Sequence, residues 1–239
     1  MHISLNKLSY NLLETIRKRV VDDDVVDLRQ VKSAVHGARG LLISQAIEKR
    51  PFAPLHDSWL QELRPTVGVR METVDASQIS GLTTEQYMRR TIVKIPEPLV
   101  RKNGLPLFSR IGPINRLGIS YDIVSPQKAL SSGYSKYTRD YIRCFQVNGY
   151  IYAISGSDEH HLPEFLDIVG IFQNPEEVYI FNDLNGDSMT ADADQSYPID
   201  LSLEIPIRQL VLEKFLGIKV NATVDYTNNA AHDQEKVQN

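Results

Sequence analysis

Apolar residues recur at steps of three and four in two N-terminal segments, and this spacing predicts two amphipathic helices. The first begins at Leu5 and has Ser4 before it as an N-cap. The second covers residues 27–49, where Asp27 and Gln30 have the spacing of a capping box. Only the acidic turn "DDDVVD" separates the two helices, so we predict an antiparallel helical hairpin over residues 1–64.

Beyond residue 64 the pattern changes from helical spacing to alternation, which is typical of half-buried strands. Val67, Val69 and Met71 alternate with polar residues, and Asn148-Gly149 between two alternating segments predicts a type I′ hairpin. Short apolar segments bounded by Pro or Gly predict further strands at residues 90–96, 107–112, 117–125 and 165–172. We therefore predict a β-rich unit, a barrel or a sandwich, over residues 65–197.

Helical spacing returns near the C-terminus. A short segment opens at Asn174-Pro175, and a longer helix begins at Ser202, with Pro206 expected in its first turn and Gly217 as its C-cap. We predict a C-terminal helix over residues 198–217 that packs on the N-terminal helices, followed by a flexible polar arm over residues 218–239. The predicted fold class is α+β: a helical bundle built from both ends of the chain, with the β-rich unit inserted.

Composition and charge argue against several classes of protein. With 26 basic and 30 acidic residues the formal charge is −4, so the basic surface expected of a DNA-binding protein is missing. The single cysteine, Cys144, cannot form an internal disulfide, which favours a reducing compartment and a buried, unreactive thiol. The N-terminus does not have the pattern of a signal peptide, and no apolar segment approaches the ~18 residues of a membrane span.

The second predicted helix contains four residues that could serve chemistry or packing: His36, Gly37, Arg39 and Gly40. A catalytic interpretation needs a nucleophile or base at a recognisable spacing, and the sequence offers none. Each glycine costs up to ~1 kcal/mol against alanine in a helix interior, so close packing of another helix explains them better. We interpret these four residues as a contact surface, with no catalytic or cofactor-binding role.

Two segments could bind a metal. The loop "DLNGDSMTADAD" carries Asp183, Asn185, Asp187, Asp192 and Asp194, but it lacks the glycine and the glutamate that an EF-hand needs at its sixth and twelfth positions. The segment "DEHH" carries Asp158, Glu159, His160 and His161 without the HExxH spacing. We predict no metal and no cofactor. A metal-dependent hydrolase that uses Asp183, Asp187, His160 and His161 remains the alternative, and a β-rich module that binds a small molecule or a peptide is a third.

Four stretches together resemble a known family. The helix pair "ISLNKLSYNLLETIRKR" and "DLRQVKSAVHGARGLLISQAIEK", the middle segment "SRIGPINRLGISYDIVSPQKAL", and the closing "PIDLSLEIPIRQLVLEKFLG" are similar to virion proteins of crAss-like phages that form rings in the head-to-tail connector. In such proteins a histidine, an arginine three residues later and a short apolar segment mark the second helix. His36, Arg39 and residues 41–43 match this pattern, while Gly40 replaces an expected alanine and Ser44 an expected arginine.

The resemblance implies a structural role. Together with a more distant likeness to the tail adaptor, or gatekeeper-type, proteins of short-tailed phages, it implies a dodecameric ring stacked beneath the portal, through which the genome passes without specific binding. The partners would be further copies of the chain, the portal and neighbouring tail proteins. Localisation would be the virion, after assembly in the host cytoplasm. On this reading His36, Gly37, Arg39 and Gly40 belong to a subunit interface.

Overall fold

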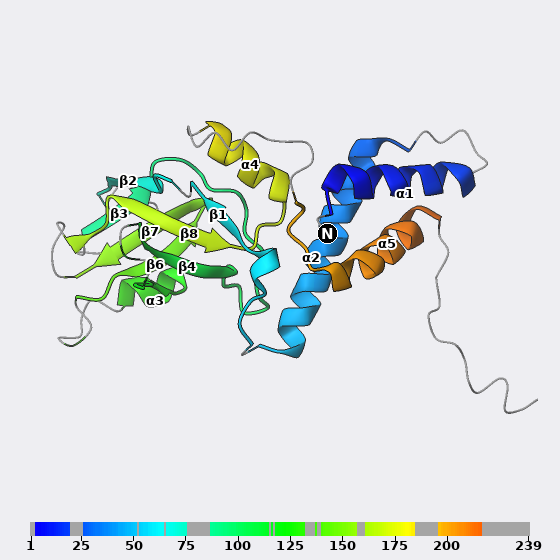
Figure 1. Cartoon of the computed structure of the whole chain (residues 1–239). Helices are drawn as coiled ribbons and strands as arrows, with labels where there is room; N and C mark the ends of the chain where they lie inside the picture. Colours follow the sequence, from blue (N-terminus) through cyan, green and yellow to red (C-terminus); the bar gives the residue numbers. More distant parts are fainter. Residues whose placement is uncertain are drawn as a thin grey trace, which may run out of the picture.

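Helices from both ends of the chain pack together at one end of the molecule, and a β domain occupies the other end (Figure 1). The computed structural model describes residues 3–19, 26–51, 53–64, 66–75, 87–114, 116, 118–131, 137, 140–156, 161–184 and 196–216. The helical end consists of α1 (Leu5–Arg19), α2 (Leu28–Lys49) and α5 (Leu201–Leu216). This arrangement confirms the predicted α+β class with helices at both ends.

The two predicted helix starts are confirmed by their hydrogen bonds. The Ser4 hydroxyl accepts from the Lys7 amide at 3.2 Å, so Ser4 caps α1. The Gln30 side chain accepts from the Asp27 amide at 3.3 Å, as the capping box before α2 requires. Apolar side chains of all three helices then form one core, which includes Leu8, Ile16, Val31, Val35, Ile207 and Val211.

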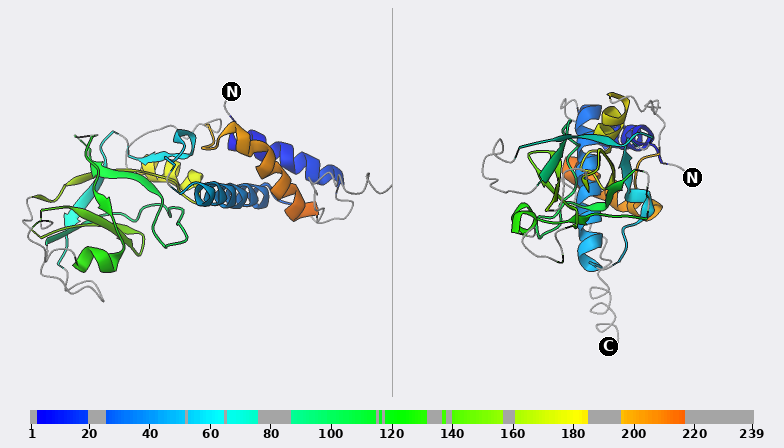
Figure 2. Two further views of the ribbon diagram at one scale, coloured as in Figure 1. Left: turned by 90° about the horizontal axis from the view of Figure 1, so that it is seen from below. Right: turned by 90° about the vertical axis from the view of Figure 1, so that its left-hand side faces the viewer.

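The antiparallel hairpin predicted for the first two helices does not form. Figures 1 and 2 show α1 crossing α2 steeply, with α2 continuing past it toward the β domain. The reason lies in the second half of α2, where Ile43 and Ile47 pack against Leu99, Leu107 and Ile171 of the β domain. Burial of this half therefore directs α2 away from α1.

Eight strands form one curled mixed sheet within the described residues, and the β domain is built around this sheet. The strands are β1 (Gln61–Leu63), β2 (Val69–Thr73), β3 (Tyr87–Thr91), β4 (Phe108–Pro113), β5 (Asp122–Ile123), β6 (Arg143–Val147), β7 (Tyr150–Ser155) and β8 (Phe165–Gly170). Their order is β1-β8-β2-β3-β7-β6-β5, and β4 also pairs with β8. All pairs are antiparallel except β5 with β6. The sheet begins at Gln61, before residue 65 where the alternating pattern predicts it to start.

The predicted hairpin at Asn148-Gly149 is confirmed. Asn148 has φ 52° and Gly149 has φ 83°, the two positive values that a type I′ turn needs, and the turn joins β6 to β7 in antiparallel register. Other strand predictions were less accurate. Strand β3 ends at Thr91, so the apolar segment at residues 90–96 is mostly outside it, and the segment at residues 117–125 contributes only the two residues of β5.

Among the described residues, three α-helices follow the N-terminal pair. Helix α4 (Pro175–Leu184) begins where Asn174-Pro175 predicted it, and Val178 and Phe181 bury it against the β-domain core. Helix α3 (Pro126–Ser131) was not predicted; it places Ala129 beneath the sheet beside Phe145. In α5 the prediction for Pro206 was wrong, because the helix begins at Leu201 and Pro206 lies inside it, beyond the first turn.

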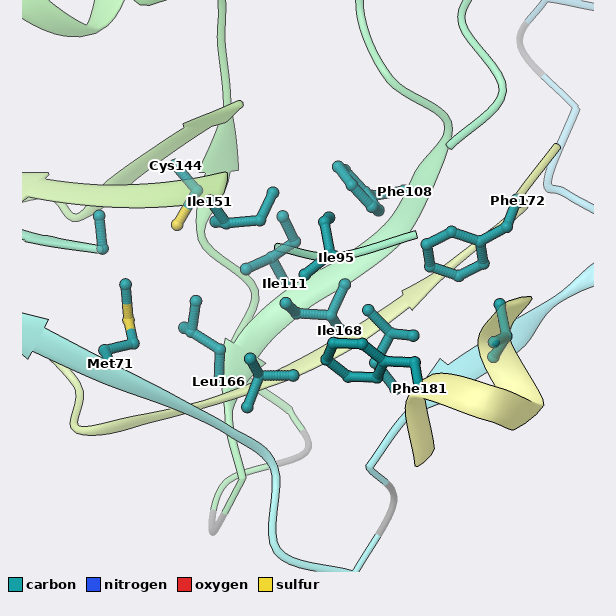
Figure 3. Packing of buried hydrophobic residues seen from close by; sticks show 14 of the residues in the cluster. Met71, Ile95, Phe108, Ile111, Cys144, Ile151, Leu166, Ile168, Phe172 and Phe181 are labelled. Atoms are coloured by element: carbon teal, nitrogen blue, oxygen red, sulfur yellow. The ribbon is translucent and has the colours of Figure 1, made fainter. Parts of the chain in front are cut away.

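The core of the β domain is made of aliphatic and aromatic side chains from several strands of the curled sheet and from α4 (Figure 3). Ile168 and Leu166 of β8 lie near its centre, and Phe108 and Phe172 meet edge to face with ring centroids 6.3 Å apart. Cys144 of β6 is fully buried in this core, as predicted. Its burial also raises the pKa of the thiol, because a thiolate there would be poorly solvated.

We expect Cys144 to be unreactive in the folded protein. Thiol reagents attack the thiolate, and Cys144 offers neither exposure nor an accessible thiolate. A coloured aromatic disulfide reagent should therefore leave the native chain unmodified and modify one thiol per chain in concentrated urea. Complete modification without denaturant would show that Cys144 is exposed to solvent in the folded chain.

Candidate subunit interface

One face of α2 forms the wall of a groove. The opposite face of the helix, with Val31, Ala34, Val35 and Ala38, is buried against α1 and α5. The outward face borders a cavity of about 730 Å³ between α2 and two β-domain segments. The groove is lined by Arg29, Lys32, Ser33, His36, Gly37, Gly40, Leu41, Ser44, Leu99, Val100, Gln173, Asn174 and Glu176. Three of the four predicted contact residues, His36, Gly37 and Gly40, therefore lie together on one surface.

Arg39, the fourth, faces inward. Its side chain is fully buried and donates to three backbone carbonyls: Pro198 at 2.9 Å, Phe172 at 2.8 Å and Trp59 at 3.3 Å. Trp59 and Pro198 lie in the two segments that join the helical end to the β domain, and Phe172 lies between β8 and α4. Burial lowers the pKa of Arg39 to about 10, so the guanidinium remains charged at neutral pH. The expectation that Arg39 contacts a neighbouring subunit is thus corrected: its polar contacts are made inside its own chain.

His36 sits at the junction between this internal network and the groove. Its Nδ1 shares a hydrogen bond of 2.8 Å with the Tyr197 hydroxyl, and its Nε2 lies 3.5 Å from Glu176 Oε2. The carboxylate favours a proton on Nε2, so Tyr197 donates to Nδ1. Glu176 also accepts from Lys32 at 2.8 Å, and the Tyr197 ring lies under the Arg39 guanidinium at 5.8 Å. His36 is therefore in contact with Tyr197 and Glu176, which in turn contact Arg39 and Lys32.

We expect His36 to make the protein less stable in mild acid. Burial lowers the pKa of His36, although Glu176 acts against this and Arg39 and Lys32 act with it. Below the ordinary histidine pKa of about 6.5 the unfolded chain then binds more protons than the folded chain, so the free energy of unfolding falls as pH falls. Burial raises the pKa of Glu176, but Lys32 and His36 lower it by more, so the net pKa is below the usual value. Glu176 therefore loses its charge at a lower pH than the one at which histidine titrates.

Urea unfolding at about pH 7.5 and about pH 5.5 measures this effect when the wild type is compared with His36→Gln. The stability advantage of the wild type should shrink at the lower pH, because glutamine keeps polar atoms but does not titrate. An advantage that is equal at both pH values would show that His36 does not titrate differently on folding.

The two glycines on the groove face have different surroundings. A Cβ at Gly40 would lie 3.3 Å from Leu99 Cδ2, which is tighter than ordinary contact. A Cβ at Gly37 would have no atom within 4 Å. A close neighbour is therefore present only at Gly40, and it is Leu99 of the segment between β3 and β4 in the same subunit, not a second helix as predicted. Gly37 opens onto the groove.

The groove also exposes apolar surface. Leu41 of α2 is 50% exposed and Val100 on the opposite wall is 46% exposed. A second hollow of about 330 Å³ shares Ser44 and Val100 with the groove and continues past Ile47 along α2. Sequence reasoning missed Val100 and Glu176, because neither has a periodic or motif signal that links it to α2. Leu41 was recognised only as part of an apolar segment.

The predicted metal-binding residues are only partly described. Asp183 lies in the last turn of α4 and His161 in the segment before β8, and both are exposed. Asp158, Glu159, His160, Asn185, Asp187, Asp192 and Asp194 lie outside the described residues. Among the residues that the structure does describe, no three His, Cys, Asp or Glu side chains are grouped closely enough to hold a metal ion.

Comparison with known proteins identifies one family. The model of the crAss phage family described as "Phage tail ring protein 2" matches residues 7–235, nearly the whole chain. No curated protein matches the sequence. Within the described part of the chain, no helix combines the length and the apolar character needed to span a membrane.

Proposed function

Because this chain belongs to the phage tail ring protein 2 family, we propose that it is the subunit of a closed ring of twelve copies in the head-to-tail connector. The ring is stacked below the portal, and its lumen forms part of the channel through which the genome leaves the head. The observation that carries the proposal is the family match over residues 7–235, which includes both the helical end and the β domain. The family is one of structural virion proteins.

The charge of the chain supports a channel through which DNA slides. A wall rich in lysine and arginine would bind phosphates and release counterions, which holds DNA in place. This chain carries an excess of acid, with a formal charge of −4. A ring of such subunits repels the phosphate backbone weakly and leaves the DNA free to move.

We further propose that the protein catalyses no reaction. The polar residues that looked most like a catalytic group, His36 and Arg39, are engaged in contacts that hold the fold together. The hydrolase alternative would need Asp183 and His161 to act together with Asp187 and His160, and no observation on the described residues favours it.

Immunogold labelling of phage particles tests the proposed position. Antibodies raised against the purified chain should label the junction between head and tail, provided that the ring is accessible from outside. Partly disrupted particles, in which heads separate from tails, control for access. Label confined to the distal tail or to the head shell would contradict a place below the portal.

A further inference from the structure

Helix α5 has more apolar surface than its own subunit covers. Apolar residues occur on all sides of "LSLEIPIRQLVLEKFL", yet only Ile207 and Val211 are fully buried. Leu201 is 56% exposed and Ile205 is 66% exposed. A helix that is apolar all round is normally covered all round.

The exposed residues form one outward face. Leu201 and Ile205 are one helical turn apart, and Ile205 is two residues from Ile207, which rotates it about 200° away from the buried side. The buried side of α5 packs on α2 and α1. The outward face of α5 therefore points away from the bundle.

The groove also faces away from the bundle, but it lies on α2, the helix against which α5 packs. Because α2 and α5 pack on each other through their buried sides, the groove and the outward face of α5 lie on different sides of the subunit. A closed ring needs such an arrangement, since each subunit meets its two neighbours through two different patches. A two-fold contact would use one patch twice.

We propose that the outward face of α5, with Leu201 and Ile205, docks into the α2 groove of the neighbouring copy in the ring. This inference rests on the proposed ring and names its seam. Leu201 and Ile205 supply branched apolar side chains, and the groove exposes Leu41 and Val100 to receive them. The groove volume of about 730 Å³ accommodates several such side chains.

The charges of the two patches are complementary. Arg29 and Lys32 border the groove and outnumber its one carboxylate, Glu176. The start of α5 brings Asp200 and Glu204 next to Leu201 and Ile205, against one cation, Arg208. Attraction between a mildly basic groove and a mildly acidic helix start selects this pairing over groove against groove or α5 against α5.

Cysteine cross-linking of the full chain tests the seam. Gly37→Cys places a thiol in the open part of the groove, and Ile205→Cys places one on α5, while buried Cys144 should not react. The two single variants are purified separately, mixed, allowed to assemble and treated with a bismaleimide linker. We expect covalent dimers in the mixture and none in either variant alone.

Any result other than this one counts against the proposed seam. Dimers from Gly37→Cys alone would indicate a two-fold contact between grooves. Rings that yield no cross-link would mean that the groove holds something else, such as a neighbouring tail protein, and would leave the proposed ring intact. A wild-type chain that forms no ring at any concentration would remove both the ring and its seam.

A pair of charge substitutions provides the second arm. Ile205→Asp should raise the protein concentration needed for half-assembly by on the order of tenfold or more without lowering the melting temperature. Leu184→Asp is the matched control, because Leu184 of α4 is 79% exposed and lies on the β domain, away from the proposed seam. Equal effects of the two variants on assembly would overturn the assignment of α5.

Discussion

We expect Arg39→Met to lower the free energy of unfolding by about 3 kcal/mol. Three hydrogen bonds from a buried, charged donor contribute roughly 1.5–3 kcal/mol each, and methionine leaves all three carbonyls without this partner. Removal of the buried charge offsets part of this lost stability. Burial lowers the Arg39 pKa to about 10, and this shift corresponds to roughly 3 kcal/mol. The loss of the hydrogen bonds outweighs the relief of desolvation, because the guanidinium donates to three chain segments at once.

Urea unfolding of full-length variants measures this loss. Arg29→Met is the control, because Arg29 lies on the same helix but is exposed, and its replacement should change stability by less than about 0.5 kcal/mol. Arg39→Lys should fall between the two, because an ammonium keeps the charge but lacks the planar fork. Equal stability of Arg39→Met and wild type would show that Arg39 does not hold the two ends of the molecule together.

Gly40→Leu and Gly37→Leu should change stability in opposite directions. At Gly40 a larger side chain collides with Leu99, which is itself packed against Ile43, Leu107 and Ile171. Overpacking of this kind costs about 1–3 kcal/mol and outweighs the gain of up to ~1 kcal/mol in helix propensity. At Gly37 only the gain remains, because nothing lies within 4 Å.

Thermal unfolding of both variants distinguishes these outcomes, and an assembly assay separates folding from ring formation. Gly40→Leu should melt below the wild type. Gly37→Leu should melt at or above it and still assemble poorly, because leucine fills the groove where α5 of the next copy docks. A Gly37→Leu chain that melts normally and also assembles normally would show that the groove stays empty in the ring.

Much of the fold was predictable because local chemistry determines it. Ser4, Asp27 and Gln30 satisfy the amides at two helix starts, and Asn148-Gly149 fits the one turn that closes β6 on β7. Such signals act over a few residues and survive in any tertiary context. The α+β class followed from them together with the change of period near residue 64.

The errors came from contacts between segments far apart in the chain. Arg39 looked like a surface residue, yet its partners are carbonyls of Trp59, Phe172 and Pro198, whose positions no sequence spacing encodes. The crossing of α1 over α2 likewise depends on where the β domain buries Ile43. The groove could be predicted only on its α2 side, through His36, Gly37 and Gly40, because the other wall comes from separate segments.

The mass of the assembled species tests the central claim most directly. Native mass measurement on the purified full chain should show one large species that stops growing with concentration, and twelve copies of a 27.1 kDa chain correspond to about 325 kDa. A closed ring saturates in this way because its last subunit joins the first. A chain that stays at 27.1 kDa at every concentration, or a mass that increases without limit as in an open filament, would contradict the ring.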